Sequence, residues 1–372
     1  MNRIALFFAL LAAVPSSGQA TPERITGPGP ISLELSTPEH KADISNQIKW
    51  GYIAWHWSGG YFVQAQVHAS PRQPAVTIFD RDGIFVRDLV FWLDGADDVD
   101  LSDVASRGDG ELVVSGSAIF PRPAEGTFYS DYFGNLRFFL AEIGPEGQIA
   151  KQLSMGLYSA ANICADEDGT IWTWGTEHPT KERQGSSERA WSSIFPTLRH
   201  YSFANGLLFD SGMQLETRNL KPNSQGSSTG GSEMVCGKDF VGVYDGHYRR
   251  WVEYDRETRS VTARPAPMIA AAKPTYREKV TGMAVTGDGE VYASIQRYSS
   301  LPNNPDVGHS IYKLDRSNPS AIRWIQVKGK TGNLFGSDGN TLVYTEAGLP
   351  PVHVAWSDVI AAPPKAEIAA KP

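Results

Sequence analysis

The chain of 372 residues carries a formal net charge of −7 and is rich in residues typical of turns and large strand side chains, with 36 Gly, 24 Pro and 11% aromatic residues. The acidic balance argues against a nucleic-acid partner, which would favour a basic patch. No stretch of helical periodicity is long enough to compete with strands, so we expect an all-β protein.

The first twenty residues have the pattern of a secretory signal peptide. Arg3 supplies the positive charge, residues 4–14 form an apolar run too short to span a bilayer, and residues 17–20 supply small side chains for cleavage. No later apolar run reaches membrane-spanning length. We therefore expect no membrane span and a mature chain that starts at Thr21 and is secreted or periplasmic.

A hairpin signature then returns along the chain. Each copy places an Asp-Gly or Gly-Gly turn, or a shorter turn, between two stretches that alternate apolar and polar residues. The copies are residues 55–63, 106–113, 164–172, 236–244, 286–292 and 337–344. Their turns recur about every fifty residues once two long insertions are removed, a period typical of propellers built from four-stranded blades.

A second, more polar hairpin follows most copies, as expected for the outer strands of a blade. Examples are residues 76–86, 139–149 and 200–209, with further strands opening at 251–257 and 311–317. The last blade has one such strand, residues 353–356, and the N-terminal strand 31–35 has no partner of its own. We predict a six-bladed β-propeller of four-stranded antiparallel blades, closed by an N-terminal strand completing the last blade. It forms one domain over residues 21–360, and the tail 361–372 is expected to be disordered.

The chain has two cysteines, Cys164 and Cys236. In an exported protein a disulfide is one possibility. Both cysteines fall at the same position of successive inner strands in the repeat, so they should point the same way round the ring, a geometry that opposes a bond. The favoured interpretation is two buried thiols that act as small apolar residues.

Residues 163–172 and 282–292 resemble the blade repeat shared by NHL-type, two-component-regulator-type and virginiamycin B lyase-type propellers. The resemblance extends as a periodic pattern over most of residues 50–360. It implies how a blade turns and carries no family-specific functional motif.

In such a fold the Asp-Gly turns lie on one face, and the long connections, residues 119–135, 178–197, 213–232 and 298–309, lie on the other. Loops on a rigid scaffold are where binding concentrates. Aromatic and hydrogen-bonding side chains in these loops are candidate contacts for a small molecule, a glycan or a protein, with solvated loop residues as the alternative: Arg122, Tyr129, Tyr132, His178, Arg183, Trp191, Tyr298 and His309. We expect a monomeric, non-catalytic binding module without a cofactor.

A competing hypothesis places a metal at the mouth of the central channel. The first residues of successive inner strands are predicted to be Asp103, Asn162, Glu233, Lys279 and Asn333. Oxygens of the first three suit calcium or magnesium, and gluconolactonase-type propellers hold a metal in a comparable place. The alternative function is therefore a metal-dependent lactonase or lyase. Lys279 could instead neutralise the carboxylates, and the sequence offers no Gly-x-Ser-x-Gly or His-Glu-x-x-His motif.

Overall fold

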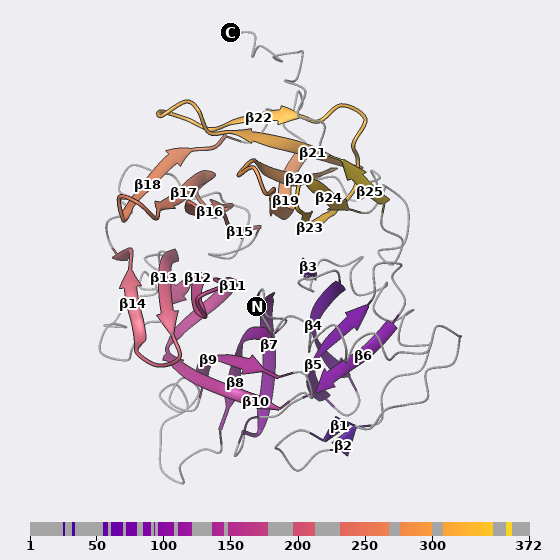
Figure 1. Ribbon diagram of the computed structural model, residues 1–372, viewed down its shortest axis with the longest axis vertical. Coiled ribbons are helices and arrows are strands. Elements are labelled where there is room, and N and C mark those ends of the chain that lie inside the picture. Colours follow the sequence, from indigo (N-terminus) through magenta and orange to yellow (C-terminus); the bar gives the residue numbers. More distant parts are fainter. Residues whose placement is uncertain are drawn as a thin grey trace, which may run out of the picture. The chain divides into compact units, whose positions relative to one another are not determined.

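The computed structural model describes residues 25–26, 32–33, 55–58, 61–69, 72–79, 85–90, 93, 96–107, 111–120, 136–144, 148–177, 196–212, 231–267, 276–299, 308–344 and 355–358. Every regular element in these ranges is a β-strand, as the composition predicts (Figure 1). None of the described residues belongs to a helix long and apolar enough to cross a membrane. The predicted signal peptide (1–20) and tail (361–372) lie outside these ranges.

The chain divides into two compact units, Met1–Asp210 and Ser211–Pro372. The first unit holds three four-stranded antiparallel sheets, in each of which strands adjacent in sequence pair with one another. They are β3 (Trp55–Ser58), β4 (Tyr61–Ala69), β5 (Arg72–Phe79) and β6 (Phe85–Val90); β7 (Asp98–Ser106), β8 (Leu112–Ile119), β9 (Leu136–Ile143) and β10 (Ile149–Gly156); and β11 (Tyr158–Ala165), β12 (Thr170–Glu177), β13 (Pro196–Ser202) and β14 (Gly206–Asp210).

The second unit has two four-stranded sheets and one sheet with three described strands, all antiparallel and paired in sequence order. They are β15 (Glu233–Cys236), β16 (Phe240–Asp245), β17 (Arg250–Asp255) and β18 (Ser260–Pro265); β19 (Tyr276–Val285), β20 (Val291–Ser299), β21 (Gly308–Asp315) and β22 (Arg323–Gln326); and β23 (Leu334–Asp338), β24 (Thr341–Tyr344) and β25 (Ala355–Asp358).

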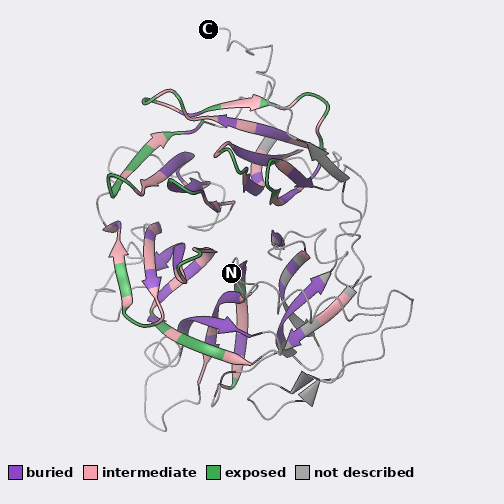
Figure 2. Cartoon of the chain, viewed as in Figure 1, coloured by how far each residue is buried: buried purple, intermediate pink, exposed green. Residues whose placement is uncertain are grey.

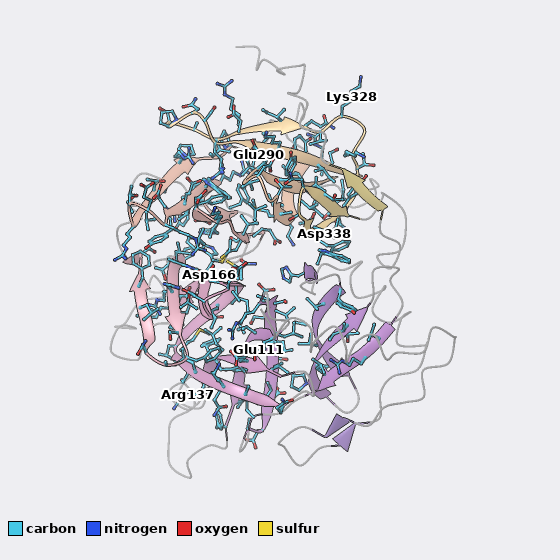
Figure 3. The ribbon with its side chains drawn as sticks, viewed as in Figure 1. Glu111, Arg137, Asp166, Glu290, Lys328 and Asp338 are labelled. Atoms are coloured by element: carbon cyan, nitrogen blue, oxygen red, sulfur yellow. The ribbon has the colours of Figure 1, made fainter. Side chains whose placement is uncertain are left out.

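The predicted first hairpins are confirmed wherever the structure describes their turns. The amide of Asp166 donates to the carbonyl of Thr170 over 2.8 Å, and Gly169 takes a positive φ of 84° that glycine adopts without strain. Thr286 and Glu290 close an equivalent turn over 2.9 Å. Figure 3 labels residues at or beside four turns of this kind, Glu111, Asp166, Glu290 and Asp338. Local turn chemistry thus fixes the start of each sheet.

Within the first unit, β7 packs on the first sheet and β11 packs on the second. The middle sheet is therefore buried on both faces, and adjacent residues of β8 enter different cores because successive side chains point to opposite faces. Val114 joins the core that includes Val76 and Phe139, whereas Val113 joins the core that includes Leu140 and Tyr158. Figure 2 shows β9 buried along most of its length, whereas the outer strand β10 is mostly intermediate or exposed.

The second unit repeats this stacking, with β15 packed on β19 and β19 packed on β23. Tyr244 and Trp251 of the sheet β15–β18 share a core with Ile295 and Tyr312 of the next sheet. Stacked four-stranded meanders that touch through their first strands are typical of propeller blades.

Four of the first strands, two in each unit, carry a β-bulge at an equivalent place. The register shifts lie between Leu101 and Asp103 in β7, between Ala160 and Asn162 in β11, and at matching points of β19 and β23. A Cβ on Gly116 would overlap the carbonyl oxygen of Asp100, and one on Gly175 would overlap that of Ser159. The bulged backbones therefore require glycine on the second strand at these two places.

The N-terminal strand differs from the prediction. Within the described residues, β2 (Ser32–Leu33) pairs with β1 (Ile25–Thr26), with Thr26 opposite Ser32, and does not join the sheet β23–β25. Pairing with a strand a few residues away costs less loop-closure entropy than pairing with the far end of the chain. The repeat pattern does not contain this difference, so it did not predict the local partner.

The expectation of two free thiols is wrong, because both Cys164 and Cys236 are disulfide-bonded. Cys164 lies two residues before Asp166, whose amide closes its turn, whereas Cys236 lies directly before Gly237, which closes its own turn onto Phe240. A shift of one residue moves a side chain to the other face of a strand, so the two positions are not equivalent. The prediction of free thiols was wrong because it assumed that both cysteines have the same register in their strands.

Candidate functional site

Asp103, the first predicted metal ligand, is a buried residue in the middle of β7, directly after the bulge, and not at the start of its strand. Its Oδ1 accepts from His56 Nε2 over 2.7 Å and from the amide of Val104 over 2.9 Å. Its Oδ2 accepts from the amide of Ile163 over 2.8 Å. The carboxylate thus joins the first strands of all three sheets in the first unit, and both of its oxygens already accept hydrogen bonds.

Asn162 occupies the position of β11 equivalent to Asp103, directly after the bulge. Its Oδ1 is buried and has no hydrogen-bond partner in the described structure, and the same holds for Nε1 of Trp174, the residue opposite it in β12. The described structure thus places an unpaired acceptor and an unpaired donor on one cross-strand pair.

The remaining predicted channel residues belong to the second unit. Glu233 is the first residue of β15, opposite Tyr244. The Lys279 side chain lies beside Gly231, and Asn333 Oδ1 accepts from the Thr281 hydroxyl over 3.1 Å. The described residues contain no group of three or more His, Cys, Asp or Glu side chains placed to hold a metal ion.

Most predicted ligand-binding residues lie outside the described ranges: Arg122, Tyr129, Tyr132, His178, Arg183 and Trp191. Tyr298 lies in β20 opposite Arg277, and its side chain is not among those described. His309 is a partly buried residue of β21, opposite Gln296. These two therefore lie at the end of β20 and the beginning of β21, on either side of residues 300–307.

At the same end of the third sheet, an arginine is fully engaged with acidic and aromatic neighbours. Arg199 of β13 donates through Nη2 to Glu177 over 2.9 Å and through Nε to Asp210 over 2.8 Å. Its guanidinium lies 4.1 Å from the centre of the Tyr158 ring. Burial raises the pKa of the Tyr158 hydroxyl, so this ring stays neutral beside the cation. These contacts describe a structural arginine.

A different arginine, not found by sequence reasoning, lies at the turn between β16 and β17. Arg250 is the first residue of β17, pairs with Asp245 at the end of β16, and is 1% exposed. Its Nε donates to Asp245 Oδ2 over 2.8 Å. Nη1 and Nη2 are buried and have no hydrogen-bond partner in the described structure.

Asp245 also shapes the turn itself. Its Oδ1 accepts from the amide of His247 over 3.1 Å and from that of Tyr248 over 3.3 Å. The Tyr248 ring lies 4.9 Å from the Arg250 guanidinium and makes an edge contact with the His247 ring at 4.5 Å. Because burial lowers the pKa of His247, its imidazole favours the neutral form, and its Nδ1 is buried without a partner in the described structure.

Next to this turn lies a second acid–base pair of the same unit. Glu278 of β19 accepts from Arg297 of β20, with Nη2 and Oε1 2.7 Å apart. Tyr244, directly before Asp245, is close enough for the charges of Arg249, Asp245 and Glu278 to act on it, and burial raises the pKa of its hydroxyl. The Arg250 turn, the beginning of β19 and the end of β20 therefore lie at one end of the second unit.

No protein-family model matches the sequence, and no curated protein matches it. Similar solved structures include an ulvan lyase of a polysaccharide lyase family, with 7% identity, a TM-score of 0.44 and coverage of 82% of this chain and 81% of that one. The Swd1 β-propeller domain of Myceliophteria thermophila has 11% identity, a TM-score of 0.37 and coverage of 82% and 95%.

A putative exo-β-1,3-galactanase from Bifidobacterium bifidum has 12% identity, a TM-score of 0.42 and coverage of 76% of this chain and 92% of that one. TM-scores this low do not establish a shared fold. The chain's own strand pairing and stacking must therefore support any assignment.

Proposed function

We propose that this protein is an exported, six-bladed β-propeller that binds a ligand or partner through the ends of its sheets that carry the long connections. The stacked four-stranded meanders of each unit support the propeller. The signal-like residues 1–20 and the disulfide-bonded state of both cysteines support export, since disulfides persist in oxidising compartments. An NHL-like blade repeat remains part of this proposal.

The observation that carries the binding function is the difference between the two ends of the sheets. At one end, short turns close the chain through backbone hydrogen bonds, such as Arg107 to Glu111 and Gly237 to Phe240, both over 2.9 Å. At the other end the strands are joined by residues 120–135, 178–195, 211–232, 266–275, 300–307 and 345–354.

Long connections on a rigid scaffold are the usual carriers of binding residues. The end that carries them is also where the described structure leaves buried polar groups of Arg250 and His247 unpaired. Ligands recruit such groups because a bound oxygen restores the hydrogen bonds that burial removed. No catalytic step is required.

The alternative of a metal-dependent lactonase or lyase, with calcium or magnesium held by Asp103, Asn162 and Glu233, has weaker support. Three N–H donors already occupy the Asp103 oxygens, and a cation would have to displace them. Calorimetric titration of chelator-treated protein with calcium, magnesium, manganese and zinc tests this alternative, which predicts a saturable site.

An array of glycans and peptides tests the binding proposal. The wild-type chain should retain a defined set of ligands, and a triple variant on the long connections should lose them while staying folded, because it removes two aromatic surfaces and a charged fork. That variant is Tyr132→Ala, Arg183→Ala and Trp191→Ala.

The control is a variant of the opposite turns, in which Asp109, Asp288 and Asp338 are changed to Asn. These turns supply backbone geometry, so the control should bind as the wild type does. Normal binding by the folded loop variant, together with loss in the turn variant, would show that the wrong end was chosen.

A further inference from the structure

We infer that the buried Arg250 guanidinium is a binding site for a single carboxylate group, held by its two outer nitrogens at the turn between β16 and β17. This inference rests on the proposed function, because it assigns a ligand group to the end of the sheets that carries the long connections. It adds the chemical class of that group.

The first step is the hydrogen-bond inventory of the guanidinium. Arginine has five N–H donors, and only the Nε donor of Arg250 is used, at 2.8 Å from Asp245 Oδ2. The remaining four donors on Nη1 and Nη2 are buried and unpaired in the described structure. Leaving charged donors unpaired costs more than leaving neutral ones, so a buried arginine of this kind requires an occupant.

The second step is that Asp245 cannot supply the missing bonds. Its Oδ1 is committed to the amides of His247 and Tyr248 in the turn, and its Oδ2 faces Nε. The carboxylate therefore fixes the guanidinium by one edge. The two outer nitrogens on the other edge are held in place without being used.

The third step concerns the shape of the occupant. Two parallel N–H groups match the two oxygens of a carboxylate in a planar, bidentate pair, which is shorter and stronger than a neutral hydrogen bond. The Tyr248 ring, 4.9 Å from the guanidinium, also limits how that plane can turn. A neutral amide presents a single uncharged oxygen, so its hydrogen bonds to the two nitrogens would be weaker and not parallel.

The fourth step concerns charge. Arg250 and Asp245 compensate one another, and burial lowers the pKa of His247 toward a neutral ring. A monovalent carboxylate adds a single negative charge beside the four unpaired N–H donors. A doubly charged phosphate would bring excess negative charge close to the Asp245 carboxylate, which buried sites disfavour.

Acetate is the probe that tests the site in the full-length mature protein. Calorimetric titration with sodium acetate, at ionic strength held constant with sodium chloride, should show saturable binding of one equivalent. Acetamide, which has the same shape without the charge, should not bind. At acetate tenfold above its Kd, the folding equilibrium constant should rise about 11-fold, measured as a rise in Tm that chloride does not reproduce.

Two conservative variants provide the matched comparison. Arg250→Lys keeps the positive charge but removes the pair of outer guanidinium nitrogens. It should therefore weaken acetate binding by at least about tenfold. Arg316→Lys, in the same unit, changes an arginine whose outer nitrogens already donate to Glu253 and to the carbonyl of Gly289, and it should leave acetate binding unchanged.

A measurement on the wild type covers the case in which Arg250→Lys does not fold. Acetate should shift the side-chain Nε resonance of Arg250 in labelled protein along the same curve as the calorimetric titration. Absence of saturable acetate binding, equal binding of acetamide, or no shift at Arg250 would each overturn the inference. Array binding without acetate binding overturns the carboxylate site alone, whereas acetate binding without any array ligand overturns the proposed function alone.

Discussion

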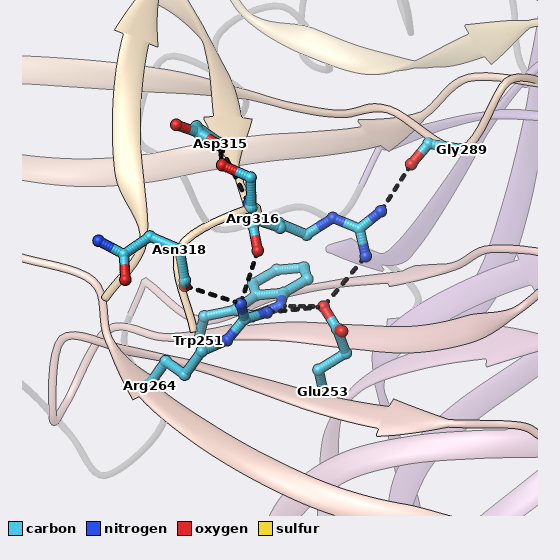
Figure 4. A network of polar contacts seen from close by, with 8 residues as sticks. Trp251, Glu253, Arg264, Gly289, Asp315, Arg316 and Asn318 are labelled. Atoms are coloured by element: carbon cyan, nitrogen blue, oxygen red, sulfur yellow. Dashed lines mark hydrogen bonds and ion pairs between the residues drawn. The ribbon is translucent and has the colours of Figure 1, made fainter. Parts of the chain in front are cut away.

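Two arginine–carboxylate groups in the second unit differ in how completely the arginines are paired. In the Glu253 network (Figure 4), Glu253 Oε2 accepts from Trp251 Nε1 over 2.6 Å, from Arg264 over 3.2 Å and from Arg316 over 3.0 Å. Backbone carbonyls take the remaining outer donors: Arg316 reaches Gly289, and Arg264 reaches Arg316 and Asn318. Both outer nitrogens of each arginine are thereby used, and only Nε of Arg264 is buried without a partner among the described atoms of this network.

At the Asp245–Arg250 turn the pairing is incomplete. Arg250 is more deeply buried than Arg316, with side chains 2% and 24% exposed, yet its outer nitrogens have no partner among the described residues. If both groups served only to hold strands together, the deeper arginine should be the better satisfied one, because burial raises the cost of an unpaired donor. The more deeply buried arginine is instead the less completely paired one. We therefore interpret the Glu253 network as structural and the Arg250 turn as a candidate binding site.

Their positions in the sheets agree with this distinction. The Glu253 network joins β17 and β18 to the residues that follow β21, and the Arg316 guanidinium also lies 3.9 Å from the centre of the Phe240 ring. It links two neighbouring sheets beside the short turns. The Arg250 turn lies at the other end of β17, where the chain enters and leaves the sheet.

The largest expected effect is a difference in the free energy of unfolding between variants of the two arginines. Arg250→Met leaves the buried Asp245 carboxylate without its cation and should cost about 3–5 kcal/mol, toward the lower end because the unpaired outer nitrogens are removed with it. Arg316→Met should cost about 1–2 kcal/mol, because Glu253 keeps Arg264 and Trp251 and the site is partly solvated. Urea unfolding of both variants measures the difference. A larger loss in Arg316→Met than in Arg250→Met would contradict the comparison.

A smaller effect tests whether the Glu253 group acts as one network. Glu253→Gln keeps an acceptor oxygen but removes the charge, so it should destabilise the fold by about 1–2 kcal/mol. Combined with Arg316→Met, the losses should be non-additive by about 0.5–1.5 kcal/mol, because the two residues share one interaction. A double-mutant cycle by urea unfolding gives this coupling. Strict additivity would mean that the 3.0 Å contact contributes nothing to folding.

The hairpins could be predicted because their information is local. An Asp-Gly pair with alternating flanks, as at Asp168 and Gly169, fixes a turn by its own backbone preferences. The strand predicted at residues 353–356 overlaps β25 at residues 355 and 356, and residues 353 and 354 lie outside the described ranges. The partner of the N-terminal strand and the state of the cysteines depend on long-range pairing and on a register difference of one residue. The local repeat pattern carries neither kind of information.

The Arg250 turn was missed for a different physical reason. Asp245 and Gly246 form an Asp-Gly pair, but the positive φ of this loop falls on Arg249, at 52°, and not on the glycine. Arg259, at 55°, plays the same part in the next loop of the sheet. The signal that could have found the site is an Asp at the end of one apolar strand followed five residues later by Arg at the start of the next. Burial of the pair comes only from packing.

The smallest expected effect is an opposite pH dependence of stability for two carboxylates, Asp245 and Asp288. Burial raises the pKa of the Asp245 carboxyl above its ordinary value of 3.8, so over the interval above 3.8 the folded state binds more protons and its stability falls as pH rises. The hydrogen bond from Thr286 lowers the pKa of the exposed Asp288, so below 3.8 the unfolded state binds more protons and stability rises with pH. The cost of Asp245→Asn should therefore shrink as pH rises above 3.8, whereas the cost of Asp288→Asn should grow as pH approaches 3.8 from below and then level off. Urea midpoints of both variants and the wild type across the acid range measure these slopes, and slopes of the same sign would mean that the two carboxylates do not differ as buried and exposed groups should.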